Sequence, residues 1–398
     1  MAGVTEPVLR GVDPYRMTAE EIASGWVPGG VVGEVPVFSR SAGTPVEALE
    51  DAIRPALRAP GPCVIEFSGG RDSSIVLAVA HRLAVREGLD LPVAFTRRYP
   101  GLPEADEDEW QELVVRHLGV TEWVICPATD EVDLLGPVAR ASLRRWGVLW
   151  PPLVHTRRTE LELARGGTLM SGEGGDEIFG AHRLTVLRQL AGRKIPWTQL
   201  HVRQAALGLA PRGVREDKLS ARMERRVGFP WLQAETRARM VRALTADTAT
   251  EPLNWRTAVR QHPYTRPVSV ALETMALLSA EADVVRSQPL LSAAFLDAVC
   301  AAGGLMGFVG RTTAMRQLFG DLLPDALLAR TDKCWFNRAV FGTHSRAFVA
   351  RWSGGGVDPS MVDADALREV WTADEPNAMT FALLQSCWLA TEGGVADA

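Results

Sequence analysis

The sequence predicts an α/β fold, with a twisted parallel sheet and flanking helices, followed by a mainly α-helical carboxyl-terminal half. Short β-favouring runs alternate with helical patterns from about residue 46 to residue 184. These helical patterns are long enough to serve as crossovers between parallel strands. Beyond residue 184 the apolar residues recur mostly at helical spacing. We therefore expect an amino-terminal extension at residues 1–45, an α/β core at 46–190 and a helical part at 191–398.

The predicted core begins with a helix and continues with strands and helices in alternation. The helical pattern VEALEDAIRPALRAP starts at residue 46 and ends at a Pro-Gly pair. The four predicted strands are CVIEF, PVAFT, EWVICPA and TLMSG, at residues 63–67, 92–96, 122–128 and 168–172. Helical patterns separate them, the first of which is SIVLAVAHRLAVREG, ending at Gly88. The loops that follow parallel strands open on one edge of the sheet, where we expect a binding site.

The two flanking parts have different patterns. The extension is rich in Gly, Pro and Val, and GWVPGGVVGEVPVF at residues 25–38 predicts turns and an edge hairpin. The second half predicts long helices, of which the clearest are QLHVRQAALGLA, WLQAETRARMVRAL, SVALETMALLSAEADVV at residues 269–285, and SAAFLDAVCAAGG.

The composition excludes several classes of protein. The chain has 398 residues, of which 46% are hydrophobic and 23% charged, and its net charge of −5 offers no basic surface for nucleic acid. It contains neither a signal-peptide pattern nor an apolar run long enough for a membrane span, so we expect a cytoplasmic protein without a membrane partner. The five cysteines are scattered and the histidines show no ligand spacing, which argues against disulfides and a zinc site.

The loop SGGRDSS joins a predicted strand to a predicted helix, and such a junction suits a phosphate. It directs free backbone amides and the positive end of the helix dipole at one point. The candidate phosphate-binding residues are Ser68, Gly69, Gly70, Ser73 and Ser74. An alternative is that the loop only caps the helix. Asp72 distinguishes the two hypotheses, because a carboxylate repels bound phosphates unless a cation such as Mg²⁺ lies between them.

A second loop, SGEGGDEIFG at residues 171–180, also follows a predicted strand. Its Asp176 lies 104 residues after Asp72. Because loops after parallel strands open on the same edge, both carboxylates can hold one metal-bound polyphosphate. The glycines of this loop are either plain turn residues or positions where the backbone approaches a substrate closely.

These motifs resemble those of a known family. SGGRDSS is similar to the pyrophosphate loop of N-type ATP pyrophosphatases, and SGEGGDEIFG is similar to the second signature of asparagine synthetases. RSQPLLSAAFLDA at 286–298 and LPDALLARTDKCWF at 323–336 resemble two further segments of that family, so the resemblance covers most of residues 46–345.

The resemblance implies an adenine nucleotide α-hydrolase-like fold and a chemical role for each matching residue. ATP would be cleaved between its α- and β-phosphates to give an acyl-adenylate and pyrophosphate, and an amine would then attack to form an amide. The residues of the first loop, with Gly172, would bind ATP and pyrophosphate, and Asp72 and Asp176 would hold Mg²⁺. Glu173 would receive a proton from the attacking amine.

Lys333, in the segment RTDKCWF, is a further candidate catalytic residue. Forty of the 43 basic residues are arginine, so a lysine within a family motif is informative. It would place a compact positive charge on phosphate oxygens or on the developing oxyanion. The alternative is an exposed surface lysine.

One departure from the family concerns the source of the amine. The SGG loop begins at residue 68, which leaves no room for the glutaminase domain of glutamine-dependent asparagine synthetases. We therefore expect a small-molecule or peptide carboxylate as substrate, with ammonia or a substrate amine as acceptor. β-Lactam synthetases and lasso-peptide cyclases, which form intramolecular amides, are an alternative. Another is a non-catalytic, nucleotide-binding partner of a biosynthetic enzyme. Transfer-RNA thiolation is disfavoured, because the chain lacks paired cysteines and a basic face.

Overall fold

The computed structural model describes residues 14–36, 43–332 and 334–392. At its centre lies a five-stranded, wholly parallel sheet in the order β3-β2-β1-β4-β5. The strands are β1 Cys63–Glu66, β2 Val93–Arg98, β3 Trp123–Pro127, β4 Thr168–Met170 and β5 Val285–Ser287. From β1 the chain adds strands first on one side and later on the other. The direction in which strands are added therefore reverses between β1 and β4. Open parallel sheets bind ligands at such a switch point.

The parallel α/β class and the first four strands are confirmed, whereas the fifth strand is a correction. The sequence predicts a helix over residues 269–285, but α13 ends at Glu281 and β5 begins at Val285. Between them Asp283 has a left-handed conformation with φ +60°, which ends the helix. Glycine usually fills such a position, so Asp283 did not mark the end of the helix in the sequence.

Helices cover both faces of the sheet and build most of the second half. They are α1 Ala19–Ser24, α2 Pro45–Arg58, α3 Arg71–Glu87, α4 Asp108–Leu118, α5 Pro137–Trp146, α6 Arg158–Leu163, α7 Gly175–Ile178, α8 Thr185–Ala191, α9 Gln199–Leu209, α10 Arg212–Val227, α11 Ala234–Ala249, α12 Trp255–Gln261, α13 Arg266–Glu281, α14 Ala293–Gly303, α15 Arg311–Phe319, α16 Asp325–Ala329, α17 Asn337–Val340, α18 Thr343–Arg351, α19 Ala364–Thr372 and α20 Phe381–Thr391. Short 3₁₀ helices are η1 Pro103–Ala105, η2 Asp130–Val132, η3 Pro152–Thr156, η4 His262–Tyr264, η5 Pro289–Leu291 and η6 Ala378–Thr380. In the part of the chain that the structure describes, no helix is long and apolar enough to cross a membrane.

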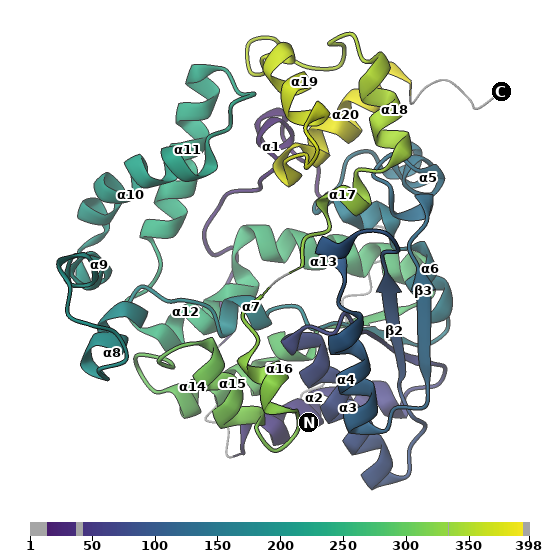
Figure 1. The fold of residues 1–398 in the computed structure, drawn as a ribbon, viewed down its shortest axis with the longest axis vertical. Helices are drawn as coiled ribbons and strands as arrows, with labels where there is room; N and C mark the ends of the chain where they lie inside the picture. The colour runs from purple at the N-terminus through teal and green to yellow at the C-terminus, as the bar shows by residue number, and fades with distance from the viewer. Residues whose placement is uncertain (1–13, 37–42, 333, 393–398) are drawn as a thin grey trace.

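The arrangement of these helices leaves the carboxyl edge of the sheet facing the middle of the molecule. In Figure 1, α3 and α4 lie beside β2 and β3, while α8 to α11 extend along the opposite side. The last helices, α18 to α20, group with α1 at the top of the view. They share a second core with α11, in which Trp231, Trp371 and Trp388 are fully buried.

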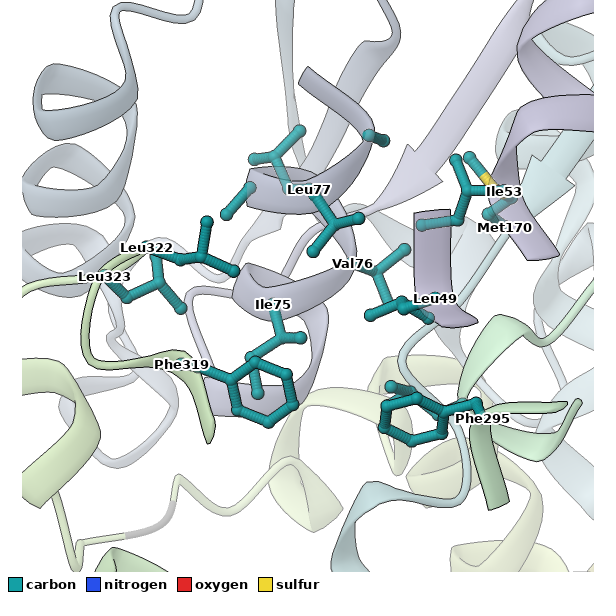
Figure 2. Packing of buried hydrophobic residues seen from close by; sticks show 14 of the residues in the cluster. Leu49, Ile53, Ile75, Val76, Leu77, Met170, Phe295, Phe319, Leu322 and Leu323 are labelled. Atoms are coloured by element: carbon teal, nitrogen blue, oxygen red, sulfur yellow. The ribbon is translucent and has the colours of Figure 1, made fainter. Parts of the chain in front are cut away.

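Two apolar cores sandwich the sheet and hold the first loop in place. Along β1, Ile65 faces the core formed by α2, α3, α14 and α15, and Val64 faces the core on the other side, as the two-residue period of a strand requires. Figure 2 shows Ile75 of α3 packed in the first core with Leu49 of α2 and Phe319 of α15. Because α3 is buried along much of its length, its first turn is fixed at the carboxyl end of β1.

The amino-terminal segment forms no hairpin within its described residues, 14–36, which corrects that prediction. It contains α1, which starts with a capping box at Thr18. Its β-favouring part pairs instead with a distant segment: Val32 donates its backbone N–H to Tyr264, and Arg266 donates its own to Gly30. The expected part boundaries at residues 45 and 190 stay predictions.

Candidate active site

The loop after β1 is a compact turn held by its own serines and by α4. The backbone N–H of Ser68 donates to Ser73 Oγ at 3.2 Å, and the two hydroxyl oxygens lie 3.1 Å apart. Gly69 has φ +87°, and a Cβ there would lie 2.9 Å from Gln111 Cγ. Gln111 also donates from Nε2 to the carbonyl oxygen of Ser68 at 3.1 Å. The close approach at Gly69 is therefore to α4, and it fixes the shape of the loop.

The first turn of α3 directs its amides at the site without a side-chain cap. The N-cap residue, Gly70, has no side chain to accept from them. Ser73 donates its hydroxyl backwards, to the carbonyl oxygen of Gly70 at 3.2 Å. Ser74 is fully buried and does not line the cavity described below. Ser68 Oγ accepts from the backbone N–H of Gly70 at 3.2 Å, so a loop serine satisfies the amide of the N-cap residue, whereas no side chain caps the amides of the first turn itself.

Close packing joins the second loop, which follows β4, to the first. A Cβ at Gly172 would lie 2.6 Å from the backbone nitrogen of Ser73, and a Cβ at Gly175 would lie 2.2 Å from Asp72 Cγ. Cβ atoms essentially never approach other atoms below 3.0 Å. The close approach at these glycines is therefore to the first turn of α3. Their predicted close approach to a substrate stays a prediction.

One guanidinium group connects the acidic residues of the two loops. Arg311, the first residue of α15, donates from Nη2 to Asp72 Oδ2 at 2.5 Å and from Nη1 to Asp176 Oδ1. The structure thus brings the two aspartates to a single cation although they lie far apart in the sequence. This is the convergence that a parallel sheet predicts.

The donor set at this position fits a magnesium ion. Mg²⁺ is usually held by one or two carboxylates together with the phosphate oxygens of a substrate. Asp72 and Asp176 supply two carboxylates, and a positive charge, that of Arg311, already lies between them. Among the described residues no group of three or more His, Cys, Asp or Glu could hold a metal ion, so a nucleotide would have to complete the coordination.

A charged network lies at the carboxyl end of β1, beside the loops. Glu66 accepts hydrogen bonds from Arg157 and, at 2.6 Å, from Nη2 of Arg286. Burial alone would raise the pKa of Glu66, but the two guanidinium groups outweigh it and hold the pKa below its ordinary value. Glu66 is therefore ionised at neutral pH, and it anchors Arg286, whose side chain is 4% exposed.

Glu173 lies at the edge of this network. Arg286 Nη2 is 3.9 Å from Glu173 Oε1, and the other carboxylate oxygen, Oε2, is buried although 36% of the side chain is exposed. Burial raises the pKa of Glu173 above its ordinary value; Arg286 opposes the shift and Glu66 adds to it. A carboxylate of raised pKa that lines a cavity is suited to accept a proton near neutral pH.

The segment around position 333 borders the same site. Lys333 itself lies outside the described residues. On either side of it, Asp332 and Cys334 line the cavity. Arg330 is held by Glu107, with 2.7 Å between Nη1 and Oε1, and stacks over Trp110 at 4.9 Å from the ring centroid. The proposed role of Lys333 stays a prediction.

A cavity of about 990 Å³ opens between these elements. It lies at the upper end of the range for small-molecule sites, about 300–1,000 Å³. The sequence-predicted residues that line it are Ser68, Gly70, Asp72, Ser73, Gly172, Glu173 and Asp176. Gly69 and Ser74 are not among the lining residues. The structure therefore brings the predicted residues of both loops to one cavity.

The histidines that the sequence places near the second loop make polar contacts. His155 Nδ1 lies 2.8 Å from Ser142 Oγ, and His182 Nε2 lies 2.9 Å from the carbonyl oxygen of Pro252. His262, which the sequence analysis did not single out, lines the cavity 3.7 Å from Glu177. Burial lowers the pKa of His262 to about 4, so it is neutral at pH 7.

Several arginines of the site were missed, and the sequence holds little signal for them. Arg157 and Arg311 lie 91 and 239 residues from their partners Glu66 and Asp72. Because nearly all basic residues here are arginine, no single one stands out. Arg286 stood within a recognised segment, RSQPLLSAAFLDA, as Arg71 and Arg330 did within SGGRDSS and LPDALLARTDKCWF, but no role was assigned to any of them.

Comparison with known proteins agrees with this geometry. A family model described as asparagine synthase matches residues 46–389. The match includes both loops, the charged network, Arg311 and the segment around position 333. No curated protein sequence matches the chain.

Proposed function

The chain belongs to the asparagine synthase family of ATP-dependent, amide-forming ligases, and from this premise we propose that it activates a carboxylate as an acyl-adenylate. The activated acyl group then passes to ammonia or to a substrate amine. One observation carries the proposal: Asp72 and Asp176 converge on the guanidinium of Arg311 at the switch point of the sheet. Paired carboxylates beside a phosphate-binding turn are what a magnesium-bound polyphosphate requires.

The first half of the reaction is the departure of pyrophosphate. A carboxylate oxygen of the acid attacks the α-phosphorus of ATP, the bond to the bridging oxygen breaks, and pyrophosphate leaves. The amides of the first turn of α3 and the hydroxyls of Ser68 and Ser73 would hold the leaving group. Asp72 and Asp176 would hold Mg²⁺, which when bound neutralises charge on the phosphates.

The second half is transfer of the acyl group to the amine. The amine nitrogen attacks the acyl carbon, AMP leaves with the electron pair of the broken C–O bond, and a proton must leave the nitrogen. Glu173 would accept that proton, and its raised pKa brings it closer to the operating pH, as general-base catalysis favours. Lys333 would stabilise the oxyanion that develops at the acyl carbon.

The test is ATP–pyrophosphate exchange over a panel of carboxylic acids, with magnesium present. We expect acid-dependent exchange that Asp72→Ala abolishes. Asp325→Ala is the matched control, because that aspartate pairs with Arg316 on the surface and should leave the rate unchanged. Nucleotide binding without exchange for any acid or amine would support the non-catalytic alternative and contradict the proposal. The mass of the product then decides between an intermolecular and an intramolecular amide.

A further inference from the structure

One side of the cavity is apolar and offers no charged group. Helix α13 presents residues spaced at i, i+3, i+4 and i+7, which lie on one face of a helix. Two tryptophan rings continue this surface. Together the six side chains that line the cavity here, called the apolar wall below, are Trp26, Trp150, Val268, Ala271, Leu272 and Met275.

The apolar wall is held in place by contacts outside the cavity. The rings of Trp26 and Trp150 meet edge to face, with centroids 5.4 Å apart. The indole N–H of Trp150 donates to the carbonyl oxygen of Pro267 at 3.0 Å, which ties it to the first turn of α13. Arg266 binds Glu21 of α1, with 2.5 Å between Nη1 and Oε1, and so fixes the segment that carries Trp26. The surface is thus formed before any ligand arrives.

The wall adjoins the proposed reaction site at two points. The helix η3 packs against α13, and the next residue after it, Arg157, binds Glu66 at the end of β1. Just before α13, His262 lies 3.7 Å from Glu177 in the loop after β4. A substrate whose carboxyl group lies at the first loop can therefore extend along α13.

The side chains of the wall need an apolar partner. Val268, Ala271 and Leu272 are only partly buried by the protein, although their spacing is that of a core-facing stripe. A purine ring would suit this surface poorly, because its nitrogens need hydrogen-bond partners when buried. The four side chains of α13 offer no donor, and the indole N–H of Trp150 is already bound to Pro267. A ligand with an apolar body removes both surfaces from water.

We propose that the carboxylate substrate carries an aromatic or branched apolar body, which packs on the apolar wall while its carboxyl group lies at the phosphate loop. This inference rests on the proposed function for the identity of the reacting group. It excludes a short, doubly charged acid such as aspartate as the preferred substrate, since a second carboxylate on the wall would lose its hydration without gaining a partner.

The test measures binding without turnover, so its outcome is separate from that of the exchange assay. Protein saturated with magnesium and α,β-methylene-ATP is titrated calorimetrically with 3-phenylpropanoate, 4-methylpentanoate and L-aspartate. We expect the two apolar acids to bind at least tenfold more tightly than aspartate, which corresponds to about 1.4 kcal/mol. Equal or tighter binding of aspartate, or no binding of either apolar acid, would overturn the inference.

Substitutions on α13 test whether the apolar acid binds at the apolar wall. Ala271→Trp fills the wall and should weaken 3-phenylpropanoate at least tenfold, while the affinity for α,β-methylene-ATP stays unchanged. Ala280→Trp places the same side chain at an exposed position of the same helix and should change neither affinity. Leu272→Ala, which removes apolar contact without adding bulk, should weaken the acid several-fold. An unchanged affinity for the acid in both wall variants, or weakened nucleotide binding in Ala271→Trp, would contradict the assignment.

Discussion

Replacement of Gly172 by alanine tests whether the two loops must touch. The added Cβ would lie 2.6 Å from the backbone nitrogen of Ser73, whereas ordinary contact begins at 3.4 Å. The second loop must therefore move by about 0.8 Å, because a backbone atom of α3 cannot rotate away as a side chain can. A displacement near 1 Å costs about a hundredfold in rate when it disturbs reacting groups, or about 2.7 kcal/mol of transition-state stabilisation.

The assay compares Gly172→Ala with the parent protein in ATP–pyrophosphate exchange and in calorimetric binding of magnesium and α,β-methylene-ATP. We expect about a hundredfold loss of kcat/KM for exchange, with a cooperative thermal transition retained. Gly213→Ala is the matched control, since a Cβ at that exposed helical position meets nothing within 4 Å. Its activity should be unchanged. Full exchange activity in Gly172→Ala would refute the argument that close contact between the loops positions the site.

Three further predictions concern the charged residues. Glu173→Gln should lower kcat for amide formation by about 10²–10⁴-fold. Because burial raises the pKa of Glu173, the acid limb of the parent's kcat–pH profile should lie above the ordinary carboxyl pKa of 4.5. Arg286→Gln should move this limb to still higher pH, because it removes a positive charge that stabilises the carboxylate. Lys333→Ala should lower kcat for amide formation by about 10²–10³-fold, and Lys333→Arg should retain more activity than Lys333→Ala. The control is Lys218→Ala, at an exposed helix position, which should match the parent protein in amide formation. Asp176→Asn should raise the magnesium concentration needed for half-maximal exchange, and an unchanged magnesium dependence would remove Asp176 from the metal site.

The sequence predicted the parts of the fold that leave a periodic signal. The four strands between residues 63 and 172 were found because each is a compact β-favouring run between helical patterns. Strand β5 was missed because its first residue continues the apolar pattern of α13, which ends at Glu281 and is followed by a left-handed Asp283 instead of a glycine. The amino-terminal segment was misread as a hairpin because its pairing partner, around Tyr264, lies more than two hundred residues away.

The acidic part of the site was predictable, and the basic and apolar parts were not. Asp72 and Asp176 each lie at the start of the helix that follows a strand, so parallel strands bring them to the same edge of the sheet. Arg311 reaches them from α15, and the order of strands says nothing of how that helix packs. The apolar wall joins Trp26 to α13 across most of the chain length, and its stripe resembles an ordinary core-facing helix until the cavity beside it is known.

The most direct test of the account follows an oxygen atom from the acid. An acid that supports exchange is labelled with ¹⁸O in its carboxyl group and incubated with ATP, magnesium and the amine, and the products are analysed by mass spectrometry. Attack of the carboxylate on the α-phosphorus predicts AMP that carries one ¹⁸O atom, together with unlabelled pyrophosphate. Formation of ADP and of ¹⁸O-labelled inorganic phosphate would contradict the account, because it would show that the acid attacks the γ-phosphorus instead.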